Sequence, residues 1–81
     1  NYARILDTVD RLNRLDGARV LDVGSSSGWF LDAARRRGAR CFGIEPDPYF
    51  CERARRALPD VVSLVNGFFP GDLPAGWDAF D

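Results

Sequence analysis

Two carboxylates and a loop bracketed by glycines are the residues of this chain best suited to chemistry. Asp22 lies two residues before Gly24, and three serines separate Gly24 from Gly28. Glycine adopts positive φ angles and has no side chain, so a ligand can approach the backbone of such a loop closely. Glu45 follows Gly24 by 21 residues, near the spacing at which an acid accepts hydrogen bonds from the hydroxyls of a ribose. The loop and the second acid predict a pocket for a nucleotide-like ligand.

The elements that must position these residues are short strands that alternate with helices. Strands are predicted at residues 19–23, 40–44 and 61–65, where apolar runs end at turn residues. Helices are predicted at residues 2–15, 28–37 and 48–58, from apolar residues at helical spacing and from the Gly and Pro residues that follow. Residues 77–80 look like the start of a fourth strand. This alternation predicts an α/β domain with a parallel sheet.

The carboxyl ends of parallel strands meet at one edge of a sheet, which brings distant residues together. The loop after the first strand and Glu45 after the second are expected there. Gly67, Phe68 and Phe69 follow the third strand, close to where an adenine would extend beyond the ribose. The ring of Phe68 or Phe69 is suited to stacking on a purine.

The loop favours one kind of ligand over another. A dinucleotide fold uses the pattern G-x-G-x-x-G, with a pyrophosphate on the helix N-terminus. This chain has G-x-x-x-G instead, and Asp22 would repel a pyrophosphate but suit a ligand that carries an ammonium group. An NAD-binding half-domain therefore remains only as an alternative.

The same residues resemble a known family. The sequence Leu-Asp-Val-Gly-Ser-Ser-Ser-Gly at 21–28 and the sequence Gly-Ile-Glu-Pro-Asp at 43–47 resemble the first two motifs of class I S-adenosylmethionine-dependent methyltransferases. Residues 67–81 are similar to that family's path from the third strand into the fourth. The resemblance covers residues 20–81 but only the first half of the family's domain. It implies a Rossmann-like three-layer α-β-α fold with a parallel sheet, truncated after strand three and the start of strand four.

The resemblance also implies a cofactor and its contacts. S-adenosylmethionine would be the cofactor, and its methyl group would pass by in-line displacement to an O, N or C nucleophile of a small-molecule or otherwise unidentified acceptor. The resemblance implies that Asp22 and the loop residues Gly24, Ser25, Ser26 and Gly28 face the methionyl moiety, that Glu45 holds the ribose hydroxyls and that Pro46 or Asp47 flanks the adenine. Gly67 and Phe68 are predicted near the adenine from their place after the third strand. No catalytic residue is predicted within the chain, because the acceptor side of the family's domain follows later.

Two positions depart from the family pattern. Ser26 stands where the family usually has the middle glycine of its loop, and Phe68 stands where an acid often reads the adenine amino group. Stacking or backbone contacts would then have to hold the adenine. These departures motivate a second hypothesis, in which the chain is a non-catalytic scaffold that keeps the fold.

Composition excludes several other classes of function. The 81 residues suffice for one small domain, and a net charge of −1 gives no electrostatic case for nucleic acid or an anionic membrane. The sequence has no His, and its two cysteines lack the spacing of metal ligands, so no metal site is predicted. With neither a signal peptide nor an apolar run of transmembrane length, a cytoplasmic setting is expected.

The ends of the chain suggest a piece of a longer protein. It begins at Asn1 and stops at Asp81, where another strand is expected. We therefore expect residues 1–81 to be the N-terminal, cofactor-binding half of a methyltransferase-like domain, inactive in isolation. The first strand would then lack its neighbour on one side, and an unpaired strand edge favours self-association.

Overall fold

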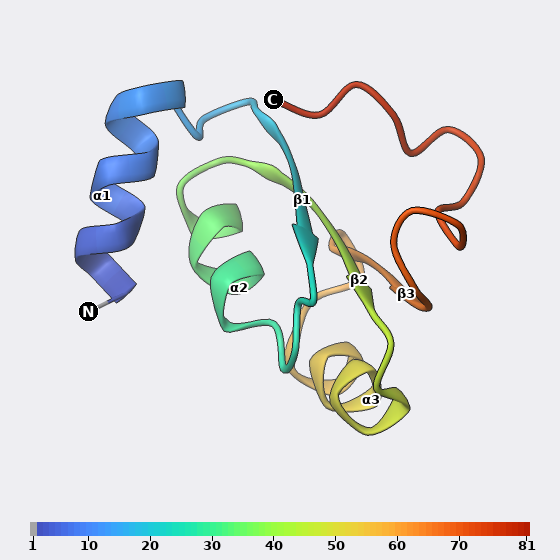
Figure 1. Ribbon diagram of the computed structural model, residues 1–81. Helices are drawn as coiled ribbons and strands as arrows, with labels where there is room; N and C mark the ends of the chain where they lie inside the picture. Colours follow the sequence, from blue (N-terminus) through green and yellow to red (C-terminus); the bar gives the residue numbers. More distant parts are fainter. Residues whose placement is uncertain (1) are drawn as a thin grey trace.

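Helices and strands alternate along the chain as predicted. The computed structural model describes residues 2–81, with backbone only for residues 2, 3, 12 and 13, so the predicted apolar contact of Leu12 lies outside the described residues. The elements are α1 (Tyr2–Asn13), β1 (Arg19–Val23), α2 (Trp29–Arg36), β2 (Arg40–Glu45), α3 (Pro48–Ala57) and β3 (Ser63–Asn66) (Figure 1). β3 begins two residues later than predicted, because a turn in which Val62 N–H donates to Pro59 O (3.0 Å) precedes it.

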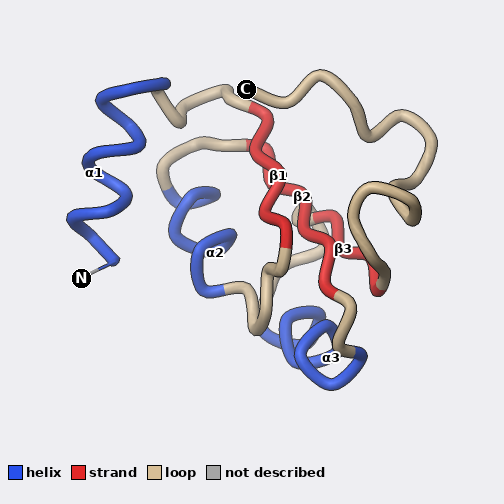
Figure 2. Tube along the Cα trace, in the orientation of Figure 1, coloured by secondary structure: helices blue, strands red, loops and turns tan. Residues whose placement is uncertain are grey.

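The three strands form one parallel sheet in the order β1-β2-β3, seen side by side in Figure 2. Val23 pairs in register with Ile44, and Glu45 pairs with Asn66. All three strands therefore end at the same edge of the sheet, the carboxyl edge, as the sequence predicts.

The helices pack on one face of this sheet. A single apolar cluster contains Leu6 from α1, Leu31 from α2 and Ala54 from α3, together with Cys41 from β2. Leu31 is fully buried, and burial of a leucine side chain contributes about 1.5–3 kcal/mol of stability. This face forms the core that holds the loops of the carboxyl edge in place.

The opposite face of the sheet is covered in part by the last residues of the chain, drawn orange to red in Figure 1. The ring centroid of Phe42 lies 5.2 Å from that of Trp77 and 5.2 Å from that of Phe80, in both cases edge to face. The Arg19 guanidinium lies 4.8 Å from the centroid of Phe42. The described residues therefore form a layer of helices and a sheet. An irregular segment covers part of the sheet face on which the third layer of the predicted α-β-α fold would lie.

The end of the chain reaches the free edge of β1. Residues 77–80, where a fourth strand was expected to start, carry no strand in the structure. Asp81 N–H nevertheless donates to Arg19 O (2.9 Å), and Arg19 N–H donates to Asp81 Oδ2 (2.8 Å). Ala18 O accepts from Arg40 on the β2 side, and successive backbone groups alternate in direction. Asp81 therefore lies on the side of β1 that faces away from β2.

Across residues 2–81, none of the helices has both the length and the hydrophobicity that crossing a membrane requires.

Candidate functional site

The loop between β1 and α2 depends on glycine at both ends. Gly24 has a φ of 74° and donates its N–H to Ile44 O (2.8 Å), which ties the loop to β2. Nothing lies within 4 Å of where a Cβ on Gly24 would be, so the backbone there is open to a ligand. Gly28 has a φ of 88°, and a Cβ there would come within 2.7 Å of Leu58 Cδ1. Gly28 thus permits close packing on the end of α3.

Ser26 adopts the backbone conformation of a glycine. Its φ is 54°, in the left-handed region that side chains disfavour, at a strain of about 1–2 kcal/mol. This is the position at which the resembled family usually has glycine, so the structure explains that preference. The same conformation directs Ser26 N–H to Glu45 Oε1, at 2.7 Å.

Glu45 joins two backbone segments through its carboxylate. Oε1 accepts from Ser26 N–H, and Oε2 accepts from Asp47 N–H at 2.8 Å. The residue is only 7% exposed. An ionised carboxylate has about four acceptor sites, so about two remain for the hydroxyls of a ligand. Sequence reasoning assigned Glu45 to the ribose but missed its second part, which is to fix the loop against the start of α3.

The residues after Glu45 are held by polar contacts from two elements. Asp47 caps α3 as predicted, because its Oδ1 accepts from Tyr49 N–H (2.9 Å). Asn66 Nδ2 donates to Glu45 O (2.8 Å) and to Pro46 O (3.0 Å). The end of β3 is therefore fastened to the end of β2.

Asp22 and Ser25 place polar groups at the end of β1 and the start of the loop. Burial raises the pKa of Asp22, and the nearby charge of Glu45 raises it further. Ser25 is 2% exposed, and its Oγ makes no hydrogen bond within residues 2–81. A buried hydroxyl without a partner is unfavourable by about 1–3 kcal/mol. The site thus contains two negative carboxylates and a spare hydrogen-bonding group, which suits a cationic polar ligand.

After β3 the chain makes a tight turn that sequence reasoning only partly anticipated. Phe68 and Phe69 are 68% and 52% exposed, so both rings are accessible, as a purine stack requires. Asp72 was missed: its Oδ2 accepts from Phe68 N–H (2.8 Å). A Cβ on Gly67 would lie 2.6 Å from the Asp72 Cβ, so Gly67 is needed for this turn. The only sequence signal for Asp72 was its place in a loop rich in Pro and Gly.

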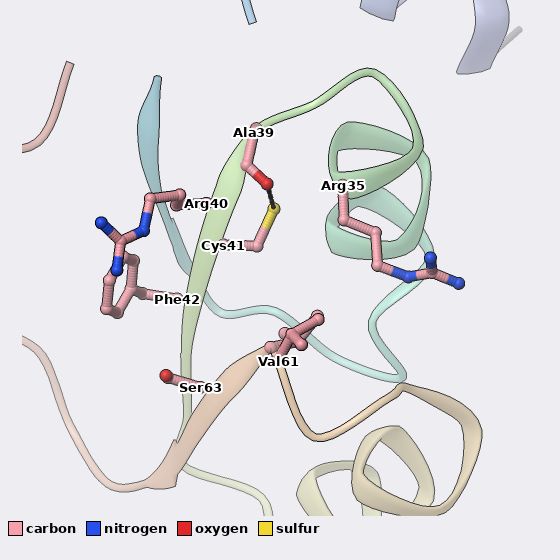
Figure 3. A pocket seen from close by; sticks show the side chains of 8 residues that line it. Arg35, Ala39, Arg40, Cys41, Phe42, Val61 and Ser63 are labelled. Carbon is pink, nitrogen blue, oxygen red and sulfur yellow. Dashed lines mark hydrogen bonds between the residues drawn. The ribbon is translucent and has the colours of Figure 1, made fainter. Parts of the chain in front are cut away.

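A separate cavity of about 450 Å³ lies at the other end of the sheet. Figure 3 shows that Arg35, Cys41, Val61 and Ser63 are among its lining residues, and that the Cys41 thiol lies against Ala39 O, at 3.7 Å. Burial raises the pKa of Cys41 to about 11, so this thiol is protonated at neutral pH. The cavity lies at the amino ends of β2 and β3, away from the predicted site.

The carboxyl edge presents groups that can hold a ligand. Its ionisable side chains are carboxylates, and in the described part of the chain no group of three His, Cys, Asp or Glu side chains is placed to hold a metal ion. What the edge offers is an open loop backbone, carboxylate acceptors and exposed aromatic rings.

Comparisons with known proteins agree with this geometry. Residues 1–76 match the family described as a methyltransferase domain. The chain is 39% identical over 69 residues to protein-L-isoaspartate O-methyltransferase 1 from an Anaeromyxobacter species, which covers 84% of this chain and 32% of that protein. It is 37% identical over 71 residues to tRNA U34 carboxymethyltransferase from Pseudomonas savastanoi, which covers 83% of this chain and 22% of that protein.

A solved structure agrees as well. The crystal structure of an S-adenosylmethionine-dependent methyltransferase from Mesorhizobium loti superimposes with a TM-score of 0.68 at 28% identity, covering 80% of this chain and 31% of that one. The chain spans about a third or less of the length of the curated relatives described above. The predicted resemblance and the predicted α/β fold are confirmed, and the chain belongs to the methyltransferase domain family of class I, S-adenosylmethionine-dependent enzymes.

Proposed function

We propose that this chain forms the S-adenosylmethionine-binding part of a methyltransferase. The observation that carries the proposal is the double backbone contact of Glu45, which fixes the open loop and the start of α3 around one carboxylate. This arrangement of the Glu45 carboxylate with the backbone of Ser26 and Asp47, which we call the cradle, orients a ligand before reaction. Positioning is the main contribution that a protein makes to methyl transfer.

The proposed contacts keep the roles that the sequence suggested. Asp22 attracts the ammonium group of the methionyl moiety, the loop lies against the same moiety, and Glu45 accepts from the ribose hydroxyls. The adenine lies near Pro46, Asp47, Gly67 and Phe68. The open space at Gly24 and the unpartnered hydroxyl of Ser25 support this fit.

When bound, the cofactor supplies an activated methyl group on a sulfonium. The chain's own residues orient it: the loop leaves its backbone open to the cofactor at Gly24, Asp22 attracts the ammonium group and Glu45 accepts from the ribose hydroxyls. The methyl acceptor is unidentified. Relatives whose names state an acceptor name two different kinds, protein L-isoaspartate and a tRNA, so the relatives support no single acceptor. The catalytic and acceptor residues are proposed to follow these 81 residues in the chain.

A non-catalytic scaffold is the second candidate. The strained serine at position 26 and the phenylalanine at position 68 favour it, because both depart from the family's binding pattern. Transfer of a labelled methyl group by the longer protein would contradict the scaffold, and cofactor binding without turnover on a broad acceptor panel would support it.

The setting is proposed to be the cytoplasm. Cys41 and Cys51 are both free thiols, and unpaired cysteines are typical of reducing compartments.

The test of the proposed cofactor is a calorimetric titration of S-adenosylhomocysteine into the longer protein that contains this chain, with NAD as the comparison ligand. We expect S-adenosylhomocysteine to bind preferentially. Glu45→Gln removes one acceptor oxygen and is expected to weaken binding about tenfold or more. Glu52→Gln, on the exposed side of α3, is the matched control and is expected to bind normally. Tighter binding of NAD, or no binding by a folded protein, would overturn the proposal.

A further inference from the structure

The side chain of Asn66, the last residue of β3, binds two successive backbone carbonyls. Its Nδ2 atom donates to Glu45 O (2.8 Å) and to Pro46 O (3.0 Å). A side-chain amide has two N–H donors, so both donors of Asn66 are used on this one segment. We call this pair of hydrogen bonds the Asn66 clamp.

The clamp stands where the sheet cannot continue its own hydrogen bonds. Glu45 and Asn66 are the last residues of β2 and β3 that pair in register. The next residue, Pro46, has no backbone N–H, so it cannot donate to a neighbouring strand. Within residues 2–81, Pro46 O accepts a hydrogen bond from Asn66 alone. The position of the segment after β2 therefore depends on a side chain of β3.

One rigid peptide connects the clamp to the Glu45 carboxylate. Pro46 O and Asp47 N–H belong to the same planar peptide group, so the orientation of one sets the orientation of the other. Asn66 donates to the oxygen of this peptide, and the N–H of the same peptide donates to Glu45 Oε2 (2.8 Å). Ser26 N–H donates to the other carboxylate oxygen, Oε1 (2.7 Å). The Glu45 carboxylate is thus held on one side by a peptide that Asn66 orients.

We propose that Asn66 is a positioning residue that directs the Glu45 carboxylate toward the ribose hydroxyls of the bound cofactor. Asn66 acts through the peptide between Pro46 and Asp47 and needs no contact with the ligand. Hydrogen bonds weaken steeply as their geometry departs from linear, so a carboxylate that loses this orientation binds the hydroxyls less tightly. This inference rests on the proposed function, because it assumes that Glu45 binds the ribose.

The test compares S-adenosylhomocysteine with its analogue that lacks the 2′ and 3′ hydroxyls, by calorimetry on the longer protein. The ratio of the two dissociation constants measures hydroxyl recognition, whereas a general loss of structure would weaken both ligands alike. The wild type is expected to bind S-adenosylhomocysteine about tenfold or more tightly than the analogue. Asn66→Ala removes both donors and is expected to reduce this ratio about 2- to 10-fold. Asn66→Asp places carboxylate oxygens against the two carbonyl oxygens and is expected to reduce it further.

The outcomes separate this inference from the proposed function. If both variants keep the wild-type ratio and a native circular dichroism spectrum, Asn66 does not position Glu45, and the proposed function stands. If the wild type binds the two ligands equally, ribose recognition by Glu45 is wrong and the inference fails with it. If neither ligand binds to the folded wild type, the proposed function fails as well.

Hydrogen exchange of the unliganded protein gives a second readout. Asn66→Ala is expected to raise the exchange rate of Asp47 N–H about 2- to 10-fold, because the peptide that donates to Glu45 Oε2 loses its orientation. Gly24 N–H, which donates to Ile44 O, is the internal control and is expected to keep its rate. An unchanged exchange rate at Asp47 would overturn the role of the clamp.

Ser63→Asp is the matched control for charge and for the stability of β3. Ser63 is the first residue of β3, so this substitution places a carboxylate at the opposite end of the same strand. The variant is expected to keep both the ligand ratio and the exchange rate of Asp47 N–H. Equal effects of Ser63→Asp and Asn66→Asp would show that the stability of the strand, and not the clamp, controls hydroxyl recognition.

Discussion

Residue 26 is a serine in a left-handed backbone conformation that favours glycine. A serine with a φ of 54° donates its N–H to Glu45 Oε1, so the left-handed conformation serves a specific hydrogen bond. The strain is maintained because the charge-assisted bond and the backbone hydrogen bonds from Gly24 N–H to Ile44 O and from Gly28 N–H to Ser25 O fix the loop. The sequence predicted the residues of this loop, but it gave no sign that Glu45 holds the loop as well as a ligand.

Ser26→Gly is therefore expected to stabilise the protein by about 0.5–1 kcal/mol. Glycine removes the left-handed strain, and its greater freedom in the unfolded chain offsets part of that gain. Urea unfolding of the longer protein measures the change. Ser27→Gly is the matched control, because Ser27 has no positive φ, and it is expected to destabilise. If both variants lose the same stability, the strain at position 26 is not real.

Asp22 carries a pH dependence of opposite sign to that of most carboxylates. Burial and the charge of Glu45 raise its pKa in the folded protein above 3.8. The folded state therefore holds this proton more tightly than the unfolded state, and the contribution of Asp22 to stability falls as the pH rises above about 3.8. As the pH rises above about 3.8, the free energy of unfolding of Asp22→Asn is expected to increase relative to that of the wild type. The same variant is expected to bind S-adenosylhomocysteine more weakly, because the ammonium group loses its counter-charge.

The measurement is the difference between the two unfolding free energies at a series of pH values from acid to neutral. Subtraction removes the titration of the shared carboxylates that do not interact with Asp22, so the difference reports Asp22 and its coupling to Glu45. A difference that is constant with pH would contradict the raised pKa, and unchanged ligand affinity would contradict the ammonium contact.

At the scale of elements, local signals at helix and strand ends were the most informative. Asp47 followed by proline predicted the start of α3, and the structure confirms it with the Asp47 Oδ1 contact to Tyr49 N–H. The start of β3 was missed by two residues because Val61 and Val62 are apolar, although Val61 is 78% exposed and Val62 lies in a turn. Apolar character alone does not distinguish a strand from a turn that packs beside it.

Asp47→Ala is expected to destabilise the protein by about 1 kcal/mol, because α3 loses its N-terminal cap. The backbone N–H of residue 47 still donates to Glu45, so the cradle is expected to keep most of its ligand affinity. Thermal unfolding and calorimetry of the same protein separate these two effects. Asp60→Ala, at an exposed aspartate after α3, is the control and should change neither quantity.

For the whole molecule, periodicity and strand order predicted the parallel α/β sheet and the meeting of three strand ends at one edge. They did not predict what covers the second face. Phe42, Trp77 and Phe80 pack there through contacts between residues far apart in the sequence, and such contacts leave no local pattern. The contact of Asp72 with Phe68 N–H could not be predicted either, because it depends on how the turn after β3 folds.

The edge of β1 gives the last prediction, which concerns the association of the 81-residue chain. Asp81 occupies this edge at Arg19, while the backbone groups of Leu21 and Val23 on the same side make no hydrogen bond within the described residues. Unpaired strand edges pair with other chains unless a charge blocks them. We expect the sedimentation coefficient to rise with concentration toward that of a dimer.

Val23→Lys is expected to keep the chain monomeric, because Val23 is 52% exposed at this edge. Val61→Lys places the same charge on an exposed valine outside β1 and is expected to leave the dimer intact. A wild-type chain that stays at 9.0 kDa at every concentration would show that Asp81 and the segment before it already protect the edge.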